Sequence, residues 1–407
     1  MDLFRNKRIV LGISGSIACY KSIELASKLA QAGAQVDTIL TNGAKKFVMP
    51  LTFQSVTGRP AYSDDALWGS QAHVLHVGLA HGADLLIIAP ATANTLAKLA
   101  HGSANNLLTV TALAATCPLL LAPAMDGGMF THPGTQNNLN ILMSWGATII
   151  GPEEGHLASG LVAKGRMSEP STLLGQTRYQ LSRGGPLKGH QVVVTAGGTR
   201  ESLDPVRFLT NRSSGKQGVA LAQAALDAGA DVTLITTTTQ TLPENGMEVV
   251  SVETALEMTT AVLEACVKAD VLLMAAAVSD FRPAAVADQK IKKAKGTPTL
   301  QLTSNPDILK EVAQQRKGCG YPKVVVGFAA ETQDVLDHAQ RKLTAKGLDM
   351  IAANDVTAED AGFAVDTNRV TLLYNHGGSE QLPLTSKAAV AEEIVKRVAE
   401  MLDDKNL

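Results

Sequence analysis

The chain has 407 residues and a formal net charge of −2, with 36 lysines and arginines against 38 aspartates and glutamates. This balance argues against a polyanion-binding surface, so we expect no nucleic-acid partner. The sequence has no uninterrupted apolar run of membrane-spanning length, and its four scattered cysteines form no metal-binding or redox pair. We therefore expect a cytoplasmic protein of two or three domains, without membrane contact.

A βαβ unit opens the chain. Residues 8–13 (RIVLGI) form a continuous apolar run, which is typical of a strand buried on both faces. A Gly/Ser turn follows, then an amphipathic pattern at 17–32 that predicts a helix, and a second strand at 36–40. A parallel α/β fold is the architecture that this order of elements predicts.

The turn at the end of the first strand has the sequence GISGS and lacks the G-x-G-x-x-G spacing of dinucleotide sites. Its serines, together with Thr41 after the second strand, suit a single terminal phosphate such as that of a flavin mononucleotide. Asp37 lies in the second strand region, so a contact with a ribose stays open at this point.

Two further buried strands are predicted at 83–89 and 118–122, and polar clusters follow them at 90–94 and 123–126. In an open parallel sheet, ligands collect beyond the carboxyl ends of the strands. His76 stands just before the first of these strands. A lone histidine at the start of a helix is usually structural, so the spacing alone gives it little weight.

The first half resembles the flavin-dependent cysteine decarboxylases in four segments, GISGSIACYKS, HVGLAHGADLLIIAPATANTLAK, PAMDGGMF and GHLASGLVAKGRMSEP, and the resemblance covers residues 5–180. It implies a flavodoxin-like domain that binds FMN and decarboxylates an acylated cysteine after its thiol is oxidised. The resemblance places Ser14, Ser16 and Thr41 near the FMN phosphate, Thr92 and Asn94 near the ring and ribityl chain, and His76 at the active-site histidine.

Two catalytic positions depart from the family pattern. Asp126 stands where these enzymes most often have an asparagine that holds the substrate carboxylate, and Ser159 stands where they often have a proton-donating cysteine. Either Asp126 is protonated in the complex, or it accepts a hydrogen bond from the substrate amide. Serine is a poorer acid than cysteine, so water or another side chain would have to assist Ser159.

A segment rich in glycine and small residues, 155–166, is typical of a lid over a pocket, and a helix is predicted at 169–181. The following residues have the composition of a linker. We expect a decarboxylase domain at 1–182, a linker at 183–190 and a second domain at 191–407.

The second half repeats the α/β plan. A strand at 191–195 enters a loop that contains Gly197, Gly198 and the run Ser213–Lys216, and a helix is predicted from 218 to 228. Glycines, a helix amino end and a lysine suit a phosphate, although the spacing is not that of a P-loop. Further strands are predicted at 232–236, 271–277, 324–327 and 350–353. The fold class expected is therefore α/β, with two open, mostly parallel, doubly wound domains, one flavodoxin-like and one Rossmann-like.

This half is similar to the phosphopantothenate–cysteine ligase half of the bifunctional coenzyme A biosynthesis family in the runs DPVRFLTNRSSGKQG, AAAVSDFRP, QKIKKAKG, SNPDIL, VVVGFAAET and GLDMIAANDV, over residues 188–405. The resemblance implies that a pantothenate carboxylate attacks CTP, giving an acyl-cytidylate, and that cysteine then displaces CMP. It assigns Asn211 and Lys290 to catalysis, Asp280 to the nucleotide or Mg²⁺, Asn305, Pro306, Asp307, Ile308 and Phe328 to the cytidine site, and Lys342 and Lys346 to the triphosphate.

The sequence therefore predicts an enzyme that joins cysteine to 4′-phosphopantothenate and decarboxylates the product to 4′-phosphopantetheine. The resemblance further implies a homo-oligomer with flavin sites shared between subunits, and it favours CTP over ATP, which spacing does not decide. Two alternatives remain. One is an NAD(P) oxidoreductase, which the missing fingerprint disfavours. The other is an active ligase whose flavoprotein half is a non-catalytic regulatory module, as Asp126 and Ser159 suggest.

Overall fold

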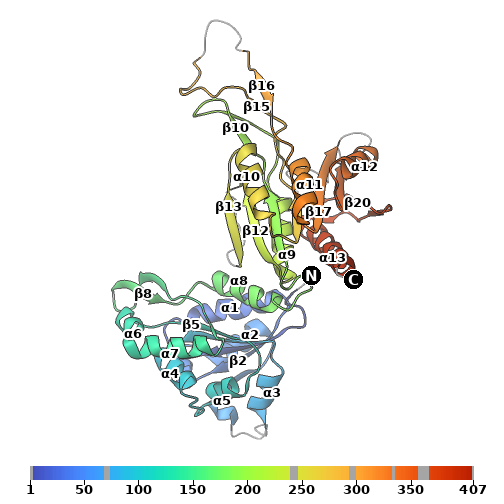
Figure 1. Ribbon diagram of the computed structural model, residues 1–407. Coiled ribbons are helices and arrows are strands. Elements are labelled where there is room, and N and C mark those ends of the chain that lie inside the picture. Colours follow the sequence, from blue (N-terminus) through green and yellow to red (C-terminus); the bar gives the residue numbers. More distant parts are fainter. Residues whose placement is uncertain are drawn as a thin grey trace. The chain divides into compact units, whose positions relative to one another are not determined.

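The computed structural model of the chain describes residues 3–67, 74–238, 246–292, 299–331, 335–355 and 366–405. The chain divides into two compact units, 2–181 and 182–407, and each contains an open, mostly parallel sheet with helices (Figure 1). This confirms the expected fold class. In the described ranges, no helix has the length and apolar character that crossing a membrane requires. The treatment of 183–190 as a linker between two domains stays a prediction.

The first unit is built on a parallel sheet of six strands in the order β3-β2-β1-β4-β5-β6, the order of a doubly wound fold. Side chains of β1 alternate between two apolar clusters: Ile9, Leu11 and Ile13 belong to one and Val10 to the other. Both faces of this strand are therefore covered, which is the physical reason for its continuous apolar sequence. The strands are β1 (Arg8–Ile13), β2 (Gln35–Leu40), β3 (Ala61–Ser63), β4 (Leu85–Ala91), β5 (Leu119–Pro123) and β6 (Thr148–Ile149).

The two helices predicted for this unit, 17–32 and 169–181, are present, with ends that differ from the prediction by one or two residues. The expected lid segment forms an antiparallel hairpin of β7 (Glu153–His156) and β8 (Val162–Arg166). The helices are α1 (Cys19–Gln31), α2 (Pro50–Thr57), α3 (Leu75–His81), α4 (Ala93–Ala100), α5 (Leu107–Ala114), α6 (Gly127–Thr131), α7 (Pro133–Ser144) and α8 (Pro170–Ser182), and the short 3₁₀ helices are η1 (Ala44–Lys46) and η2 (Asp64–Leu67).

The second unit is built on an eight-stranded sheet in the order β13-β12-β9-β14-β17-β18-β20-β21. The strands are parallel from β13 to β18, and the last two are antiparallel to their neighbours. They are β9 (Gln191–Ala196), β12 (Asp231–Thr236), β13 (Met247–Ser251), β14 (Val271–Met274), β17 (Val324–Glu331), β18 (Met350–Asp355), β20 (Val370–Tyr374) and β21 (Ser379–Gln381). The helices are α9 (Lys216–Asp227), α10 (Ala255–Ala265), α11 (Ile308–Cys319), α12 (Val335–Ala345) and α13 (Lys387–Lys405).

The described residues of this unit also form two-stranded ribbons: β10 (Arg200–Ser202) with β11 (Phe208–Thr210), β15 (Phe281–Pro283) with β16 (Leu302–Ser304), and β19 (Thr367–Asn368) with β22 (Thr385–Ser386). The β15–β16 ribbon extends away from the main sheet (Figure 1). The predicted start of α9 at Gly218 is two residues late. Gly215 takes a left-handed conformation with φ of 73° and ends the loop there, so the helix begins at Lys216.

Candidate functional site

A cavity of about 620 Å³ lies at the carboxyl ends of the central strands of the first unit. Loops after β1, β2, β4 and β5 supply its walls, as expected for a ligand site in an open parallel sheet. The predicted residues Ser16, Thr41, Thr92 and Asn94 all line it. Other residues in the lining are Gly15, Asn42, Gly43, Asp64, Lys98, Asn105, Asn106, Met125 and Met129.

The loop after β1 and the loop after β2 approach each other closely at one end of this cavity. A Cβ added to Gly15 would lie 2.8 Å from the carbonyl carbon of Gly43, so only glycine allows the two backbones to approach in this way. Thr92 caps the nearby helix α4, where its hydroxyl accepts a hydrogen bond from the Thr95 N–H. Backbone approach, hydroxyl groups and a helix amino end together suit a phosphate group.

Ser14 supports this cavity without lining it. Its side chain is buried, its hydroxyl donates to the Pro90 carbonyl at 2.7 Å, and it accepts from the Thr92 N–H at 3.0 Å. The hydroxyl therefore fixes the backbone that enters α4. The predicted direct contact between Ser14 and a phosphate stays a prediction.

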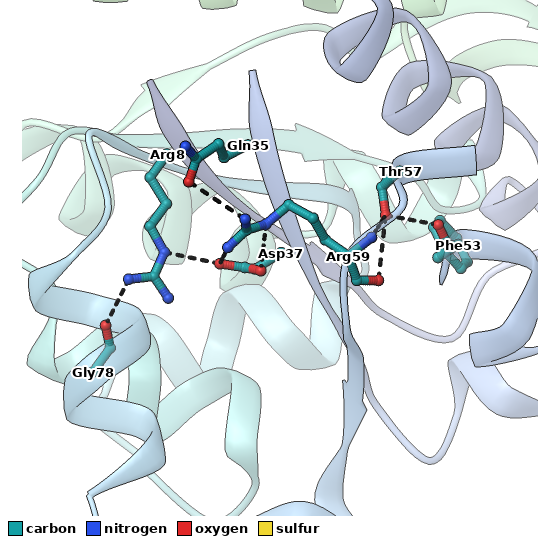
Figure 2. A network of polar contacts seen from close by, with 7 residues as sticks. All are labelled: Arg8, Gln35, Asp37, Phe53, Thr57, Arg59 and Gly78. Atoms are coloured by element: carbon teal, nitrogen blue, oxygen red, sulfur yellow. Dashed lines mark hydrogen bonds and ion pairs between the residues drawn. The ribbon is translucent and has the colours of Figure 1, made fainter. Parts of the chain in front are cut away.

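Asp37 has a structural contact that the sequence left undecided. Figure 2 shows its carboxylate between two guanidinium groups: Arg8 Nε donates at 2.8 Å, and Arg59 donates through Nε at 2.9 Å and Nη2 at 3.1 Å. Only 1% of the Asp37 side chain is exposed. The open possibility of a ribose contact is therefore wrong, because the carboxylate is covered by its own ion pairs and does not reach the described lining of the cavity.

The two positions that depart from the family pattern, Asp126 and Ser159, contact each other. Ser159 Oγ donates to Asp126 Oδ2 at 2.7 Å, and the Gly128 N–H donates to Asp126 Oδ1 at 3.0 Å. The hydrogen bond from Ser159, followed by that from Gly128, holds the pKa of the Asp126 carboxyl below its ordinary value. In the free protein Asp126 is therefore the charged acceptor of the pair, and the Ser159 proton faces the carboxylate.

The β7–β8 hairpin brings Ser159 to this place. The Met125 N–H donates to the Gly165 carbonyl at 3.1 Å, and a Cβ on Gly165 would lie only 2.2 Å from the Met125 oxygen. Glycine is thus required for the hairpin to pack beside Asp126. The contact explains how two positions far apart in sequence form one pair.

His76 lies in the first turn of α3 and is half-buried. Its Nδ1 atom is buried and has no hydrogen-bond partner among the described residues. The described residues that line the first cavity do not include His76. The structure therefore does not bring this histidine to the cavity of its own chain.

A second cavity, of about 670 Å³, lies at the carboxyl ends of the strands of the second unit. It gathers predicted residues from segments far apart in sequence: Asn211, Asp280, Asn305, Pro306, Asp307, Ile308, Phe328, Lys342 and Lys346. The glycine-rich loop and the start of α9 form one wall, since residues 211–218 all line the cavity. This is the position that a phosphate-binding loop requires.

Two lysines line this cavity, one in α12 and one in the turn that follows it, and each contacts another residue of the lining. Lys342 Nζ donates to the Phe328 carbonyl at 2.7 Å, and Lys346 Nζ pairs with Asp307 Oδ1 at 3.1 Å. Asp307 also caps helix α11, where it accepts from the Lys310 N–H at 3.4 Å. The cluster places positive charge beside an ordered carboxylate.

Two asparagine side chains hold the backbone of another part of the cavity wall. The Asn211 side chain donates to the Val278 carbonyl at 3.1 Å, and the Asn305 side chain donates to the Ser279 carbonyl at 2.8 Å. The Asn305 N–H also donates to the Asp280 carbonyl at 2.8 Å. These bonds hold the stretch after β14 in the cavity wall, where the Asp280 side chain is exposed.

Lys290 is exposed in the segment between β15 and β16, and the described lining of the cavity does not contain it. Its predicted catalytic role stays a prediction. In the described part of the chain, no group of three His, Cys, Asp or Glu side chains is arranged to hold a metal ion.

Sequence reasoning placed Lys216 in the predicted phosphate-binding loop, but it assigned no role to Asn354, Asn368 and Lys387, which also line this cavity. Lys216 and Asn354 had a local signal, because they follow a glycine-rich loop and a buried strand. Asn368 and Lys387 had none, since Asn368 reaches the cavity at the end of β19 and Lys387 at the start of α13.

Two family models match the chain: Flavoprotein over residues 2–181, and DNA/pantothenate metabolism flavoprotein C-terminal domain over residues 187–402. The Coenzyme A biosynthesis bifunctional protein CoaBC of Bacillus subtilis (strain 168) is 45% identical over 400 residues, which are 98% of this chain and 98% of that protein. The protein of the same name from Vibrio cholerae serotype O1 is 43% identical over 407 residues, 99% of this chain and 100% of the relative. The crystal structure of the C-terminal domain of a protein with that name has a TM-score of 0.46 at 37% identity, covering 54% of this chain and 99% of the other.

Proposed function

The chain belongs to the family of coenzyme A biosynthesis bifunctional proteins, and from this premise we propose how its two cavities divide the work. The protein is a bifunctional enzyme with a phosphopantothenoylcysteine decarboxylase half and a phosphopantothenate–cysteine ligase half. The family and the activity expected from the sequence are thus confirmed. The nucleotide, the metal, the assembly and the roles of individual residues are the subject of the proposal.

The ligase reaction takes place in the 670 Å³ cavity, and the convergence of nine predicted residues on that cavity is the observation that carries the proposal. The carboxylate of 4′-phosphopantothenate attacks the α-phosphate of CTP, an O–P bond forms, and pyrophosphate leaves with the electrons of the broken bond. Lys342 and Lys346 neutralise the triphosphate. Asn211 donates to the acyl-cytidylate without adding charge.

Magnesium accompanies the nucleotide in this proposal. Mg²⁺ usually binds one or two carboxylates together with phosphate oxygens, so the single exposed carboxylate of Asp280 in the cavity wall suits a nucleotide-borne ion. Phe328 and residues 305–308 surround the nucleoside. The preference for CTP over ATP rests on the family resemblance.

The decarboxylase reaction takes place at the 620 Å³ cavity, which we assign to FMN. The fit is supported by the close approach of Gly15 and Gly43, which a side chain would block, and by the hydroxyl groups of Ser16, Thr41 and Thr92 in the lining. When bound, FMN supplies the oxidation of the substrate thiol and the later return of the electrons. The protein orients the substrate, and Asp126 accepts hydrogen bonds, including one from the substrate amide.

His76 completes this site from a neighbouring subunit. The support is its absence from the described lining of its own chain's cavity, together with a buried, unpartnered Nδ1 that a contact between subunits could satisfy. The protein is therefore a homo-oligomer in this proposal. A cytoplasmic location agrees with its phosphorylated substrates and its nucleoside triphosphate.

The test supplies the purified protein with 4′-phosphopantothenate, cysteine, CTP and Mg²⁺ and follows pyrophosphate and carbon dioxide separately. We expect both products and a flavin absorbance spectrum. Pyrophosphate without carbon dioxide would instead support the alternative of a regulatory flavoprotein half. The absence of both products would contradict the proposal.

A matched pair of lysine variants tests the nucleotide site. Lys346 and Lys310 both face Asp307, at 3.1 and 3.6 Å, but only Lys346 is among the described residues that line the cavity. Lys346→Met should raise the KM for CTP at least about tenfold, the loss expected for one charge-assisted contact. Lys310→Met should leave it unchanged. Equal effects of the two substitutions would contradict the assignment.

A further inference from the structure

The ligase cavity contains a second polar cluster that the proposed nucleotide chemistry does not use: Lys216, Asn354, Asn368 and Lys387. They come from the first residues of α9 and α13, the end of β18 and the β19–β22 ribbon. The proposed ligation joins an acid to the amine of cysteine at the expense of a nucleotide, so the cavity must also place the cysteine. The chemistry of this cluster decides whether it can hold that substrate.

Contacts within the chain keep these residues together. Gln217 Nε2 donates to the Lys387 carbonyl at 3.2 Å, and Asn368 Nδ2 donates to Gln217 Oε1 at 3.5 Å. Lys216 Nζ pairs with Asp366 Oδ1 at 2.7 Å, and the Lys387 N–H donates to the Asp366 carbonyl at 2.9 Å. The starts of α9 and α13 are therefore linked into one wall of the cavity.

Asn354 provides an unsatisfied acceptor in this wall. Its Oδ1 atom is buried and, among the described residues, has no hydrogen-bond partner. A buried polar atom without a partner is costly, so a ligand that reaches it should carry an N–H or O–H donor. A fully ionised phosphate or carboxylate has only acceptors. An amino group is a donor that fits this atom.

Lys387 provides the complementary charge. Its side chain is only 7% exposed, and it lies near the ammonium group of Lys216. Burial, followed by the charge of Lys216, lowers the pKa of Lys387, so an anion in the cavity would stabilise its charged form. An ammonium group has three N–H donors, and the amino end of α13 adds a partial positive charge. A carboxylate can therefore bind here in addition to the contacts that Lys387 makes within the chain.

We propose that Asn354 and Lys387 form the subsite for cysteine in the ligase reaction: Asn354 Oδ1 accepts from the α-amino group, and Lys387 Nζ donates to the α-carboxylate. This inference rests on the proposed ligase function. The amine loses a proton and forms the new C–N bond, the acyl C–O bond breaks, and CMP leaves with the bonding electrons. The two protons released from the ammonium group pass to solvent or to the leaving phosphate.

The test compares cysteine with cysteamine, which has the amine and thiol but lacks the carboxylate. The wild-type protein should prefer cysteine in kcat/KM. Lys387→Gln should reduce this preference at least about tenfold, as expected for the loss of one charge-assisted contact, and Lys387→Arg should retain part of it. Lys396→Gln, on the exposed face of the same helix, is the matched control and should change nothing.

Hydroxylamine separates this subsite from the nucleotide site, because it traps the activated acid without using a carboxylate. Asn354→Leu and Lys387→Gln should raise the KM for cysteine, while hydroxylamine-supported pyrophosphate release and the KM for CTP stay within about twofold of wild type. An equal loss of hydroxylamine-supported pyrophosphate release in these variants would show that the cluster binds phosphate and would overturn the inference. An unchanged cysteine preference in Lys387→Gln would also overturn it. Failure of the wild-type protein to release pyrophosphate would instead refute the ligase proposal itself.

Discussion

Replacing Asp37 by asparagine should lower the stability of the first unit but leave its binding of flavin unchanged. The substitution keeps the size of the side chain but removes the charge that receives three hydrogen bonds from Arg8 and Arg59 (Figure 2). An asparagine amide also turns an N–H donor toward one of the guanidinium groups. Two positive charges are then left side by side without a counter-charge.

The size of the effect follows from the burial of the three groups. Breaking a buried ion pair by removing one partner costs about 3–5 kcal/mol. Here only Asp37 is fully buried, at 1% exposure, whereas the side chains of Arg8 and Arg59 are 31% and 32% exposed and can be partly rehydrated. We therefore expect a loss of about 2–3 kcal/mol in the free energy of unfolding, which corresponds to a fall in Tm of roughly 5–10 °C for a unit of this size.

Tryptophan fluorescence provides the assay, because both tryptophans of the chain, Trp68 and Trp145, fall within residues 2–181 of the sequence. Asp65→Asn is the control: its carboxylate also pairs with a lysine, Lys45, at 2.7 Å, but its side chain is 79% exposed. The control should melt within about 1 °C of wild type, since exposed ion pairs contribute little.

The flavin content of Asp37→Asn decides between the two interpretations of this residue. Below the transition the variant should bind flavin as wild type does, because Asp37 is absent from the described lining of the cavity. Loss of flavin with an unchanged Tm would refute the structural role and restore the ribose contact.

Two further predictions concern ionisation. Ser159→Ala removes the largest cause of the low Asp126 pKa, so that pKa should rise. The acidic limb of the pH profile for carbon dioxide release should then move to higher pH. An acidic limb that stays in place would show that Asp126 does not control it. Glu169 receives a hydrogen bond from buried Lys21 at 2.9 Å, and chiefly for that reason its pKa lies below the ordinary value. Because the folded pKa is the lower one, its contribution to stability is present above the unfolded pKa of about 4.3 and is lost as pH falls through the folded pKa. Glu169→Gln should therefore lower the fluorescence-detected Tm more at pH 7 than at pH 3, and an equal loss at both would refute the ion-pair explanation.

Local sequence determined most of the central strands of both units, since a strand covered on both faces is mostly apolar. Arg8–Ile13 and Gln191–Ala196 were found this way. The edge of the second sheet was missed: β20 and β21 are short, and their antiparallel pairing depends on β18, which lies before them in the chain. Short strands at an edge carry too little pattern to be recognised locally.

The sequence also predicted many of the residues that line the second cavity, because polar residues that follow buried strands collect at one edge of a parallel sheet and the family resemblance supplied the rest. Only the tertiary structure paired Ser159 with Asp126, covered Asp37 with Arg8 and Arg59, and brought Lys387 to the cavity. In each of these contacts, the sequence around one residue gives no indication of which residue it will contact. Periodicity and turn composition report which backbone a segment forms, whereas the environment of a charged side chain is decided by whatever the folded chain packs against it.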